Sequence, residues 1–203
     1  MNNKPLEFVL NFESKSLKGF NYRFAKDFDI IEIFNILNKL YKEDGGLKAL
    51  FEYGYKAPHP SPHPSRGEVT TINNCTINHI FTMLQAVTDY FYSNAKNEVG
   101  QGFYHFIPNP KNGGAVKRMN MFLRWMVRKG PVDLGVWDFI STSELLIPID
   151  VHVARISREM GLLTRKSNDF RAVIELTENL KKICPNDPVK FDFAMFGLGV
   201  NKD

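Results

Sequence analysis

Two residues of this sequence, a lysine and an aspartate 33 positions apart, have side chains that could do chemistry together. Lys117 follows the glycines Gly113 and Gly114 in NGGAVKRMNMF, and Asp150 follows a proline in LLIPIDVHVARIS. A deprotonated lysine amine is a nucleophile, and a carboxylate stabilises positive charge and accepts protons. Each residue also has a plain structural interpretation, because Lys117 can simply begin a basic helix and Asp150 can simply cap one, which contributes about 1 kcal/mol.

A helix predicted for residues 117–128 would position the lysine. Its apolar face repeats at three- and four-residue steps and consists of Met119, Phe122, Leu123, Met126 and Val127. Its opposite face is polar and consists of Lys117, Asn120, Arg124 and Arg128. Residues 111–130 contain six basic side chains and no acidic one, although exposed helix faces usually mix the two signs. The unmixed charge predicts an anionic partner for this face, and a plain solvated surface is the alternative.

Further helices are predicted around the aspartate and along the rest of the chain. One begins at Asp150 and is closed by Gly161, and another is capped by Asp169. Asp187 before Pro188 predicts the start of the last helix, since Asp favours the cap position and Pro the first helical position. Residues 27–44 and 75–94 also have helical apolar spacing. Because there is no internal repeat and no parallel-sheet pattern, the sequence predicts an all-α fold.

The composition limits the class of protein. A chain of 203 residues with 43% hydrophobic and 24% charged residues suits one domain or two closely packed lobes. The net charge of +4 is compatible with nucleic acid, but many metabolic enzymes have a similar charge. Cys75 and Cys184 form no Cys-x-x-Cys motif, which predicts a cytoplasmic protein without an iron–sulfur cluster. No apolar run reaches the roughly 18 residues that a membrane span needs.

Two segments rich in helix breakers divide the chain. A Pro- and His-rich loop is predicted at about residues 56–74, and a second cluster of turn residues spans residues 107–114. His59 and His63 each precede a proline and could suggest a pair of metal ligands. The prolines stiffen this spacing and no carboxylate or cysteine stands beside the histidines, so no metal site is predicted. We expect an N-terminal helical lobe at residues 1–110 and a second lobe at residues 111–203.

The stretch IPIDVHVARIS resembles the motif of helix-hairpin-helix DNA glycosylases, in which an aspartate lies at a helix N-terminus in the mouth of the active site. The lyase-competent members carry a lysine upstream, after a glycine-containing hairpin, and Lys117 matches that position. The long separation between Lys117 and Asp150 resembles the archaeal 8-oxoguanine DNA glycosylase branch. The similarity is stronger to an uncharacterised bacterial family, a domain of unknown function. It is dense over about residues 111–199, in the blocks KRMNMFLRWMVR, VDLGVWDF, IPIDVHVARIS, GLLTRK and DPVKFDFAMFGLG, and thin at GFNYRF.

The resemblance implies a two-lobed helix-hairpin-helix fold, with a glycosylase-like second lobe, and a function in base excision DNA repair. The implied partner is double-stranded DNA with a damaged base, such as an oxidised purine, or with an abasic site, and no cofactor is implied. Lys117 would attack the sugar and form a Schiff base, while Asp150 would stabilise the positive charge that develops. Two features depart from the pattern. NPKNGGAVK lacks the Leu-Pro-Gly-Val-Gly hairpin, and the chain begins only some twenty residues before GFNYRF, which suggests an N-terminally shortened member.

Other side chains are assigned around this pair. Contacts with nucleic acid are expected from Arg118, Asn120, Arg124, Arg128 and Lys129. Trp125 and Trp137 are candidates for a base pocket, with a place in the core as the alternative, and His152 is expected to orient the turn after Asp150. The alternative function is a non-catalytic DNA- or RNA-binding module that retains the glycosylase fold. A metabolic enzyme is a weaker alternative, because the sequence has no phosphate loop, dinucleotide fingerprint or metal-ligand set.

Overall fold

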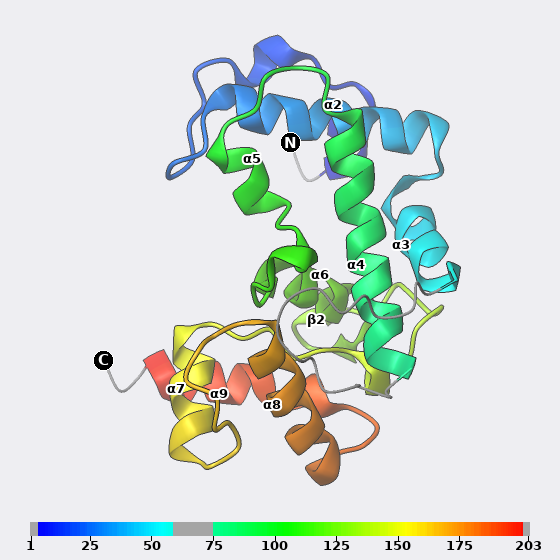
Figure 1. Ribbon diagram of the computed structural model, residues 1–203. Helices are drawn as coiled ribbons and strands as arrows, with labels where there is room; N and C mark the ends of the chain where they lie inside the picture. Colours follow the sequence, from blue (N-terminus) through cyan, green and yellow to red (C-terminus); the bar gives the residue numbers. More distant parts are fainter. Residues whose placement is uncertain (1–3, 59–74, 201–203) are drawn as a thin grey trace. The chain divides into compact units, whose positions relative to one another are not determined.

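The computed structural model describes residues 4–58 and 75–200, and this part of the chain is mostly helical (Figure 1). It divides into two compact units. The first comprises Met1–Ala57 and Thr82–Asn109, and the second comprises Pro58–Phe81 and Pro110–Asp203. Among the described residues, 75–81 group with the second unit.

The first unit is built around the helix α2 (Asp27–Glu43). Four elements pack on α2, and they are α1 (Pro5–Leu10), the 3-10 helix η1 (Ser14–Leu17), α3 (Gly46–Lys56) and α5 (Gln101–Phe106). The apolar spacing of α2 places Ile30, Ile36 and Leu40 in the core. α3 also approaches α4 (Cys75–Asn94) closely, because a Cβ at Gly54 would lie 2.9 Å from the Cα of Met83.

Two buried carboxylates of α2 fix the segment that precedes α5. Asp29 Oδ1 accepts the Gly100 N–H at 2.6 Å, and Glu32 Oε1 accepts the Lys96 N–H at 2.6 Å. Burial raises the pKa of the Glu32 carboxyl, but hydrogen bonds from the Asn97 side chain and the Lys96 amide outweigh this and hold the pKa below its usual value. These bonds tie the backbone that precedes α5 to α2.

The second unit contains most of the remaining elements. In chain order these are η2 (Pro110–Asn112), α6 (Lys117–Val127), β1 (Lys129–Gly130), β2 (Asp133–Leu134), η3 (Thr142–Glu144), α7 (Val151–Glu159), α8 (Phe170–Ile183), η4 (Pro188–Phe191) and α9 (Asp192–Val200). α7 packs along α9, and α8 packs against η4. The first turns of α4 join this unit, where the rings of Phe81 and Phe170 meet edge to face at 5.4 Å between centroids.

The apolar stretch LLIPI runs through the core of the second unit without joining a sheet. Residues 145–149 are all buried. A buried extended segment must satisfy its backbone N–H groups, and the Ile147 N–H donates to the Thr177 hydroxyl on α8 at 3.1 Å. Pro148 has no N–H to satisfy, and the chain then turns at Asp150 into α7. The run has the composition of a strand because it is surrounded by core on all sides.

The structure confirms the predicted helical class and several of the predicted helix starts. α6 begins at Lys117, and α7 follows the N-cap Asp150. α8 is capped by Asp169, whose Oδ1 accepts the Ala172 N–H at 3.1 Å. The starts of α7 and α8 were predictable because a capping side chain and the apolar spacing that follows it are local features of the sequence. α6 follows Val116 without a side-chain cap, and its start was predictable from apolar spacing alone.

The structure differs from the predictions in two elements of the second unit. Residues 129–134, for which the sequence predicted no strand, contain the short antiparallel hairpin β1–β2. Asp187 precedes Pro188 as expected but makes no side-chain cap, since its carboxylate accepts from Arg128 Nε at 2.8 Å. The segment after it is therefore a 3-10 turn, and the last α-helix begins only at Asp192.

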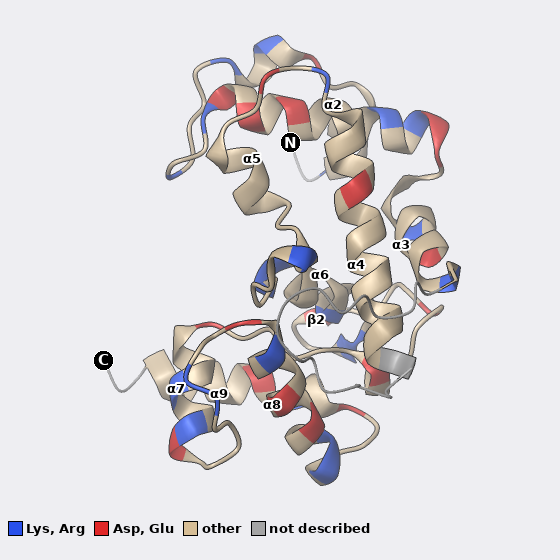
Figure 2. Ribbon diagram, in the orientation of Figure 1, with Lys and Arg blue, Asp and Glu red and all other residues tan. Residues whose placement is uncertain are grey.

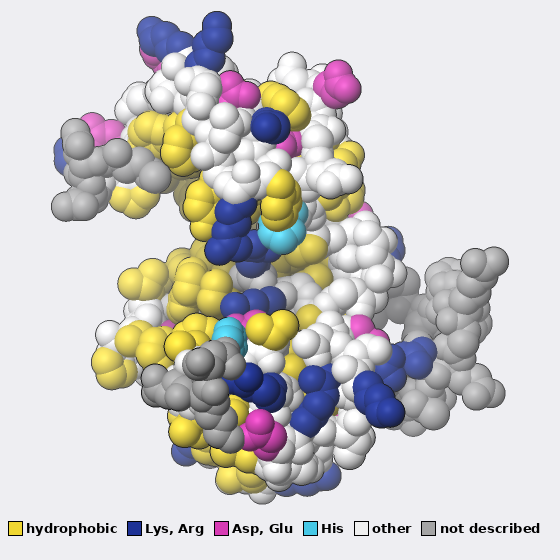
Figure 3. Space-filling view, turned by 90° about the vertical axis from the view of Figure 1, so that its left-hand side faces the viewer, with side chains coloured by type: hydrophobic (Ala, Val, Ile, Leu, Met, Phe, Trp, Pro, Cys, Tyr) yellow, Lys and Arg dark blue, Asp and Glu magenta, His cyan; other side chains and the backbone are white. Residues whose placement is uncertain are grey.

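Charged and apolar side chains are distributed over both units. Lysine and arginine positions are spread along the described chain (Figure 2), and several large hydrophobic side chains reach the surface (Figure 3). No helix among the described residues is long and apolar enough to cross a membrane. Most of the predicted Pro- and His-rich loop, with His59 and His63, lies outside the described residues.

Candidate active site

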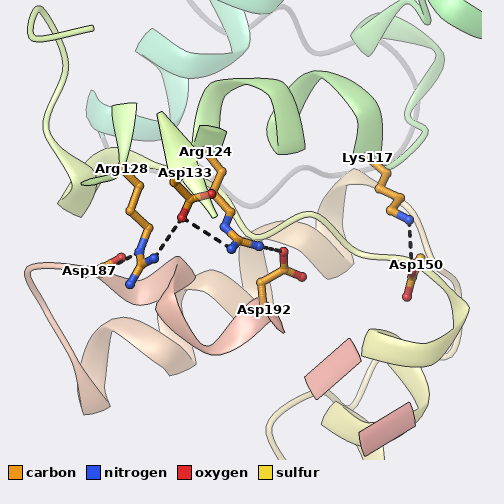
Figure 4. Close-up of polar contacts among 7 residues, drawn as sticks. All are labelled: Lys117, Arg124, Arg128, Asp133, Asp150, Asp187 and Asp192. Carbon is orange, nitrogen blue, oxygen red and sulfur yellow. Dashed lines mark hydrogen bonds and ion pairs between the residues drawn. The ribbon is translucent and has the colours of Figure 1, made fainter. Parts of the chain in front are cut away.

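Lys117 and Asp150 form an ion pair in the second unit. Lys117 Nζ lies 2.9 Å from Asp150 Oδ2 (Figure 4). Lys117 is the first residue of α6 and Asp150 is the N-cap of α7, so two helix starts bring together side chains that are 33 positions apart. The lysine side chain is 39% exposed and the aspartate side chain 13%. The lysine side chain is therefore partly accessible from solvent, while the aspartate side chain is largely covered.

The two carboxylate oxygens of Asp150 have separate partners. Oδ1 accepts the backbone N–H groups of His152 and Val153 at 3.0 and 2.9 Å, as a helix cap does. Oδ2 accepts from the Lys117 ammonium. The structural interpretation of Asp150 as a cap and its pairing with Lys117 thus hold at the same time.

Asp150 is held in its charged form. Burial raises the pKa of Asp150, but the hydrogen bonds from the Val153 N–H and from Lys117, together with the positive charge of Lys117, outweigh the effect of burial. The pKa consequently lies below its usual value, and the carboxylate is anionic at neutral pH. An anion fixed beside an amine can stabilise a developing cation and exchange protons with the nitrogen.

The loop before Lys117 has a strained backbone. Val116 has a φ of 41°, in the left-handed region that β-branched residues rarely adopt. The loop is anchored nearby, because the Gly113 carbonyl accepts the N–H of Phe170 at 2.8 Å. Strained conformations persist where the surrounding structure over-determines them, and they occur often at functional sites. Here the strain sets the direction in which α6, and with it Lys117, begins.

The helix α9 places an aromatic side chain beside the pair. The ring centroid of Phe196 lies 6.0 Å from Lys117 Nζ and 5.7 Å from the ring of His152. Gly199 allows α7 and α9 to approach, since a Cβ there would lie 2.6 Å from the His152 Cβ. Phe196 is partly exposed, so an apolar surface borders the amine. The His152 ring packs against Phe196, and the orienting role of His152 stays a prediction.

A second group of charges lies near the pair, and we call it the Arg124 network. Its members are Arg124, Arg128, Asp133, Asp187 and Asp192 (Figure 4). Arg124 binds Asp192 through Nη1 and Asp133 through Nη2, the latter at 3.4 Å. Arg128 binds Asp133 through Nη1 at 2.9 Å and Asp187 through Nε at 2.8 Å. The anionic partners of this part of α6 therefore belong to the same chain.

The expectation that α6 presents a solvated basic stripe to nucleic acid is wrong for the centre of the helix. The Arg124 side chain is only 3% exposed, and Asn120 is buried. Arg128 is half-buried between two carboxylates. Helical spacing identifies the residues that share a face but not what packs on that face, and here distant acids such as Asp192 cover it.

The other predicted site residues have diverse environments. Arg118 is half-buried and Lys129 is exposed, and contact with nucleic acid remains a prediction for both. Trp137 is buried and meets the Phe122 ring edge to face at 5.4 Å, which places it in the core. Trp125 is partly exposed on α6. Of the two tryptophans, only Trp125 has the exposure that a contact with a base requires.

Asp192 was missed by the sequence interpretation. Burial raises the pKa of Asp192; the charge and hydrogen bond of Arg124 lower it, the charge of Asp150 raises it further, and the net result is a raised pKa. The charge of Lys117 acts on it as well, so the ion pair and the Arg124 network share one electrostatic environment. An aspartate directly before the apolar run FAMFGLGV was the available sign of a charge at a helix start.

The pair of Lys117 and Asp150 is suited to covalent chemistry on an electrophilic carbon. A deprotonated lysine amine forms an imine with a carbonyl-type carbon, and the adjacent carboxylate can take up and return the proton. In residues 4–58 and 75–200, no group of three or more His, Cys, Asp and Glu side chains is arranged to hold a metal ion.

Similarity to known proteins exists at the level of a family. No curated protein and no solved structure matches the chain. The family match agrees with the similarity to a domain of unknown function, and it carries no link to DNA glycosylases. The family described as "Protein of unknown function (DUF2400)" matches residues 1–201, and the chain therefore belongs to that family.

Proposed function

We propose that the chain is a DNA glycosylase with abasic-site lyase activity and that Lys117 is its nucleophile. The observation that carries the proposal is the 2.9 Å contact between Lys117 Nζ and Asp150 Oδ2, which joins two helix starts. The substrate class and a helix-hairpin-helix fold come from the resemblance of IPIDVHVARIS to glycosylase motifs. The proposal explains why a partly exposed lysine side chain, a largely covered carboxylate and an exposed aromatic ring occur together.

The first chemical step would displace the base. The Lys117 amine gives up a proton, for which Asp150 Oδ2 is within hydrogen-bond distance, and its electron pair forms a bond to the sugar C1′. The C1′–N bond to the base breaks, and the base leaves with the bonding electrons and takes up the proton that Asp150 passes on, which leaves Asp150 anionic. Asp150, which its lowered pKa keeps anionic, stabilises the positive charge on the sugar as this bond breaks.

The second step would cleave the strand. The Lys117 nitrogen, now bonded to C1′, gives up a second proton, and its electron pair forms a protonated imine with C1′ as the C1′–O bond of the sugar ring breaks. The ring oxygen leaves with the bonding electrons and takes up a proton. The iminium acidifies C2′, a base removes the C2′ proton, and the C3′–O bond breaks so that its electrons leave on the 3′ phosphate. Water then hydrolyses the imine and restores the lysine. One nucleophile therefore serves both base removal and strand cleavage.

A base that is rotated out of the duplex needs an aromatic or apolar surface to receive it. Two exposed phenylalanines of α9 supply such a surface in the unit that holds the nucleophile. Phe196 lies beside Lys117, and the ring centroid of Phe193 is 5.4 Å from the Arg124 guanidinium carbon. Arg118 and Lys129 remain the residues assigned to phosphate contacts, which would be sensitive to salt.

Borohydride trapping tests the proposal. The full chain is incubated with an oligonucleotide that carries an abasic site, and sodium borohydride reduces any imine to a stable amine. We expect a covalent adduct with the wild-type chain and none with Lys117→Ala. Lys182→Ala removes an exposed lysine of α8 and should leave the adduct unchanged, and Lys190→Ala tests the lysine of η4 as a rival nucleophile.

The outcomes separate the proposed function from its alternative. Absence of an adduct with the wild-type chain, or an adduct that persists in Lys117→Ala, contradicts the lyase assignment. Release of an oxidised purine from a duplex, measured without borohydride, reports base removal separately from strand cleavage. If damaged and intact duplexes bind equally and no product forms, the non-catalytic nucleic-acid-binding module is favoured.

A further inference from the structure

A two-residue turn in the first unit has an arginine at a position where glycine is usual. Tyr22 and Ala25 form an antiparallel bridge with two backbone hydrogen bonds of 3.0 Å. Arg23 and Phe24 are the central residues, and the φ of Arg23 is 56°. Two-residue hairpin turns need a positive φ at the first central position, which glycine and asparagine adopt most easily. An arginine at this position therefore strains the backbone, whereas a glycine would not.

The strained turn is held firmly by the elements behind it. Ala25 is buried, and Gly102 of α5 lies so close that a Cβ there would be 2.5 Å from the Ala25 Cα. The next residue, Lys26, donates its N–H to the buried Asp29 carboxylate at 3.1 Å. A non-glycine residue keeps this conformation only where its surroundings over-determine it. The turn is thus a rigid support for the side chains that it carries.

The side chains of the turn are exposed, although the rings of Tyr22 and Phe24 also contact the side chains of Phe106 and His105 on α5. Tyr22 is 47% exposed, Phe24 is 50% exposed, and Arg23 is exposed as well. The Arg23 guanidinium carbon lies 5.5 Å from the centroid of the Tyr22 ring, and His105 meets the Phe24 ring edge to face at 4.3 Å. Two aromatic rings and a planar cation are therefore presented together on one short turn.

The surroundings of the turn are basic and aromatic. Residues 18–28 contain three exposed cations, Lys18, Arg23 and Lys26, and Asp27 is the acidic residue among them. The Asp27 carboxylate accepts the Gly19 N–H at 2.7 Å. Two further exposed aromatic residues belong to this stretch, Phe20 and Phe28. Figure 3 shows basic side chains beside hydrophobic ones on the surface of the first unit.

We propose that the Tyr22–Ala25 turn binds single-stranded DNA by stacking Tyr22 and Phe24 on unpaired bases, with Arg23 bound to the strand. Aromatic rings stack on any base because every base has a π face, and clustered cations attract the phosphates. Rings that are exposed and already fixed lose little conformational entropy on binding. The proposal explains why the turn has an arginine in a strained conformation, because a glycine at this position could not bind the strand through a side chain. The choice of DNA over RNA rests on the proposed function. The stacking of bases on Tyr22 and Phe24 is inferred from the turn itself and does not depend on that function.

Fluorescence anisotropy of a labelled oligothymidylate with the full chain tests the stacking. Phe24→Leu and Tyr22→Leu each remove one ring and keep an apolar side chain, and each should weaken binding about tenfold. Tyr53→Leu is the matched control, because Tyr53 is an exposed tyrosine of the same unit on α3, outside the turn. Its affinity should equal that of the wild-type chain.

Arg23→Gly separates binding from folding. Glycine adopts a φ of 56° without strain, so the melting temperature should stay the same or rise. The affinity for oligothymidylate should nevertheless fall several-fold, because the cation is lost. A purely structural arginine would give the opposite result, with unchanged affinity in this variant.

The outcomes distinguish this inference from the proposed function. Unchanged affinity in all three turn variants overturns the inference, and so does equal or tighter binding of intact duplex or of RNA of the same sequence. Lys117→Ala should retain wild-type affinity for oligothymidylate. If the turn variants bind oligothymidylate more weakly but no borohydride adduct forms, the inference holds and the lyase assignment is refuted. If an adduct forms but the turn variants bind as the wild-type chain does, only the inference is refuted.

Discussion

Asp150 divides its carboxylate between two tasks, with Oδ1 on the backbone of α7 and Oδ2 on the Lys117 ammonium. The first task needs a hydrogen-bond acceptor, and the second needs a negative charge. Asparagine is as good a helix cap as aspartate but carries no charge. At the scale of this residue, a substitution can therefore separate the structural role from the proposed chemical one.

Asp150→Asn should slow the chemistry without unfolding the chain. We expect the free energy of unfolding to fall by less than about 1 kcal/mol, since the cap is kept and one partly exposed ion pair is lost. The rate of adduct formation should fall on the order of 100-fold, because the charge that stabilises the sugar cation is removed. Urea denaturation and trapping time courses measure the two effects. Asp150→Ala adds the loss of the cap, about 1 kcal/mol, and a wild-type trapping rate in Asp150→Asn would contradict the electrostatic role.

The lowered pKa of Asp150 predicts a dependence of stability on pH. A carboxyl whose folded-state pKa lies below its unfolded value of about 3.9 stabilises the fold above that pH, and this contribution is lost as the pH falls through the folded-state pKa. Below about pH 4, the free energy of unfolding of the wild-type chain should fall more steeply than that of Asp150→Asn. Glu32, Asp169 and Glu175 also have lowered pKa values, but they are common to both proteins. Parallel curves would show that Asp150 contributes nothing.

At the scale of the element, α6 is held in the second unit by its arginines as well as by its apolar face. Arg124→Met replaces the buried cation by an apolar side chain of similar length and leaves Asp133 and Asp192 without it. Removing one partner of a buried ion pair costs roughly 3–5 kcal/mol of unfolding free energy. Trp125→Ala, at the adjacent and partly exposed position, should cost much less. Urea denaturation compares the two variants, and equal losses would mean that the network contributes little to holding α6.

The loop before α6 offers a matched pair of glycines. Gly113 has a φ of 76°, Gly114 has no positive φ, and a Cβ at either position would meet nothing within 4 Å. Gly113→Ala therefore measures backbone strain alone, roughly 1–2 kcal/mol, and should slow adduct formation because the start of α6 shifts. Gly114→Ala should be neutral or slightly stabilising. Thermal unfolding and trapping of both variants test this, and identical behaviour would show that the loop conformation does not position Lys117.

At the scale of the whole molecule, local features of the fold were predictable and long-range partners were not. The start of α7 followed from its cap and the start of α6 from apolar spacing, and the pairing of Lys117 with Asp150 was anticipated from a resemblance to a family motif. The burial of Arg124 was not predictable, because its partner Asp192 lies 68 positions away. The spacing of residues along one helix does not indicate which distant residues pack on it.

The net charge of +4 gives a last prediction, which concerns binding to duplex DNA. Only cations that are not already paired with carboxylates are expected to bind phosphates. Each phosphate contact adds about 0.9 to the magnitude of the slope of log affinity against log salt concentration. Lys129→Ala should therefore reduce the slope by about one contact, whereas Arg128→Gln should leave it unchanged because Asp133 and Asp187 already bind that guanidinium. Anisotropy titrations over a series of salt concentrations measure the slopes, with Lys182→Ala as the control. If Arg128→Gln reduces the slope as much as Lys129→Ala does, Arg128 contacts DNA after all.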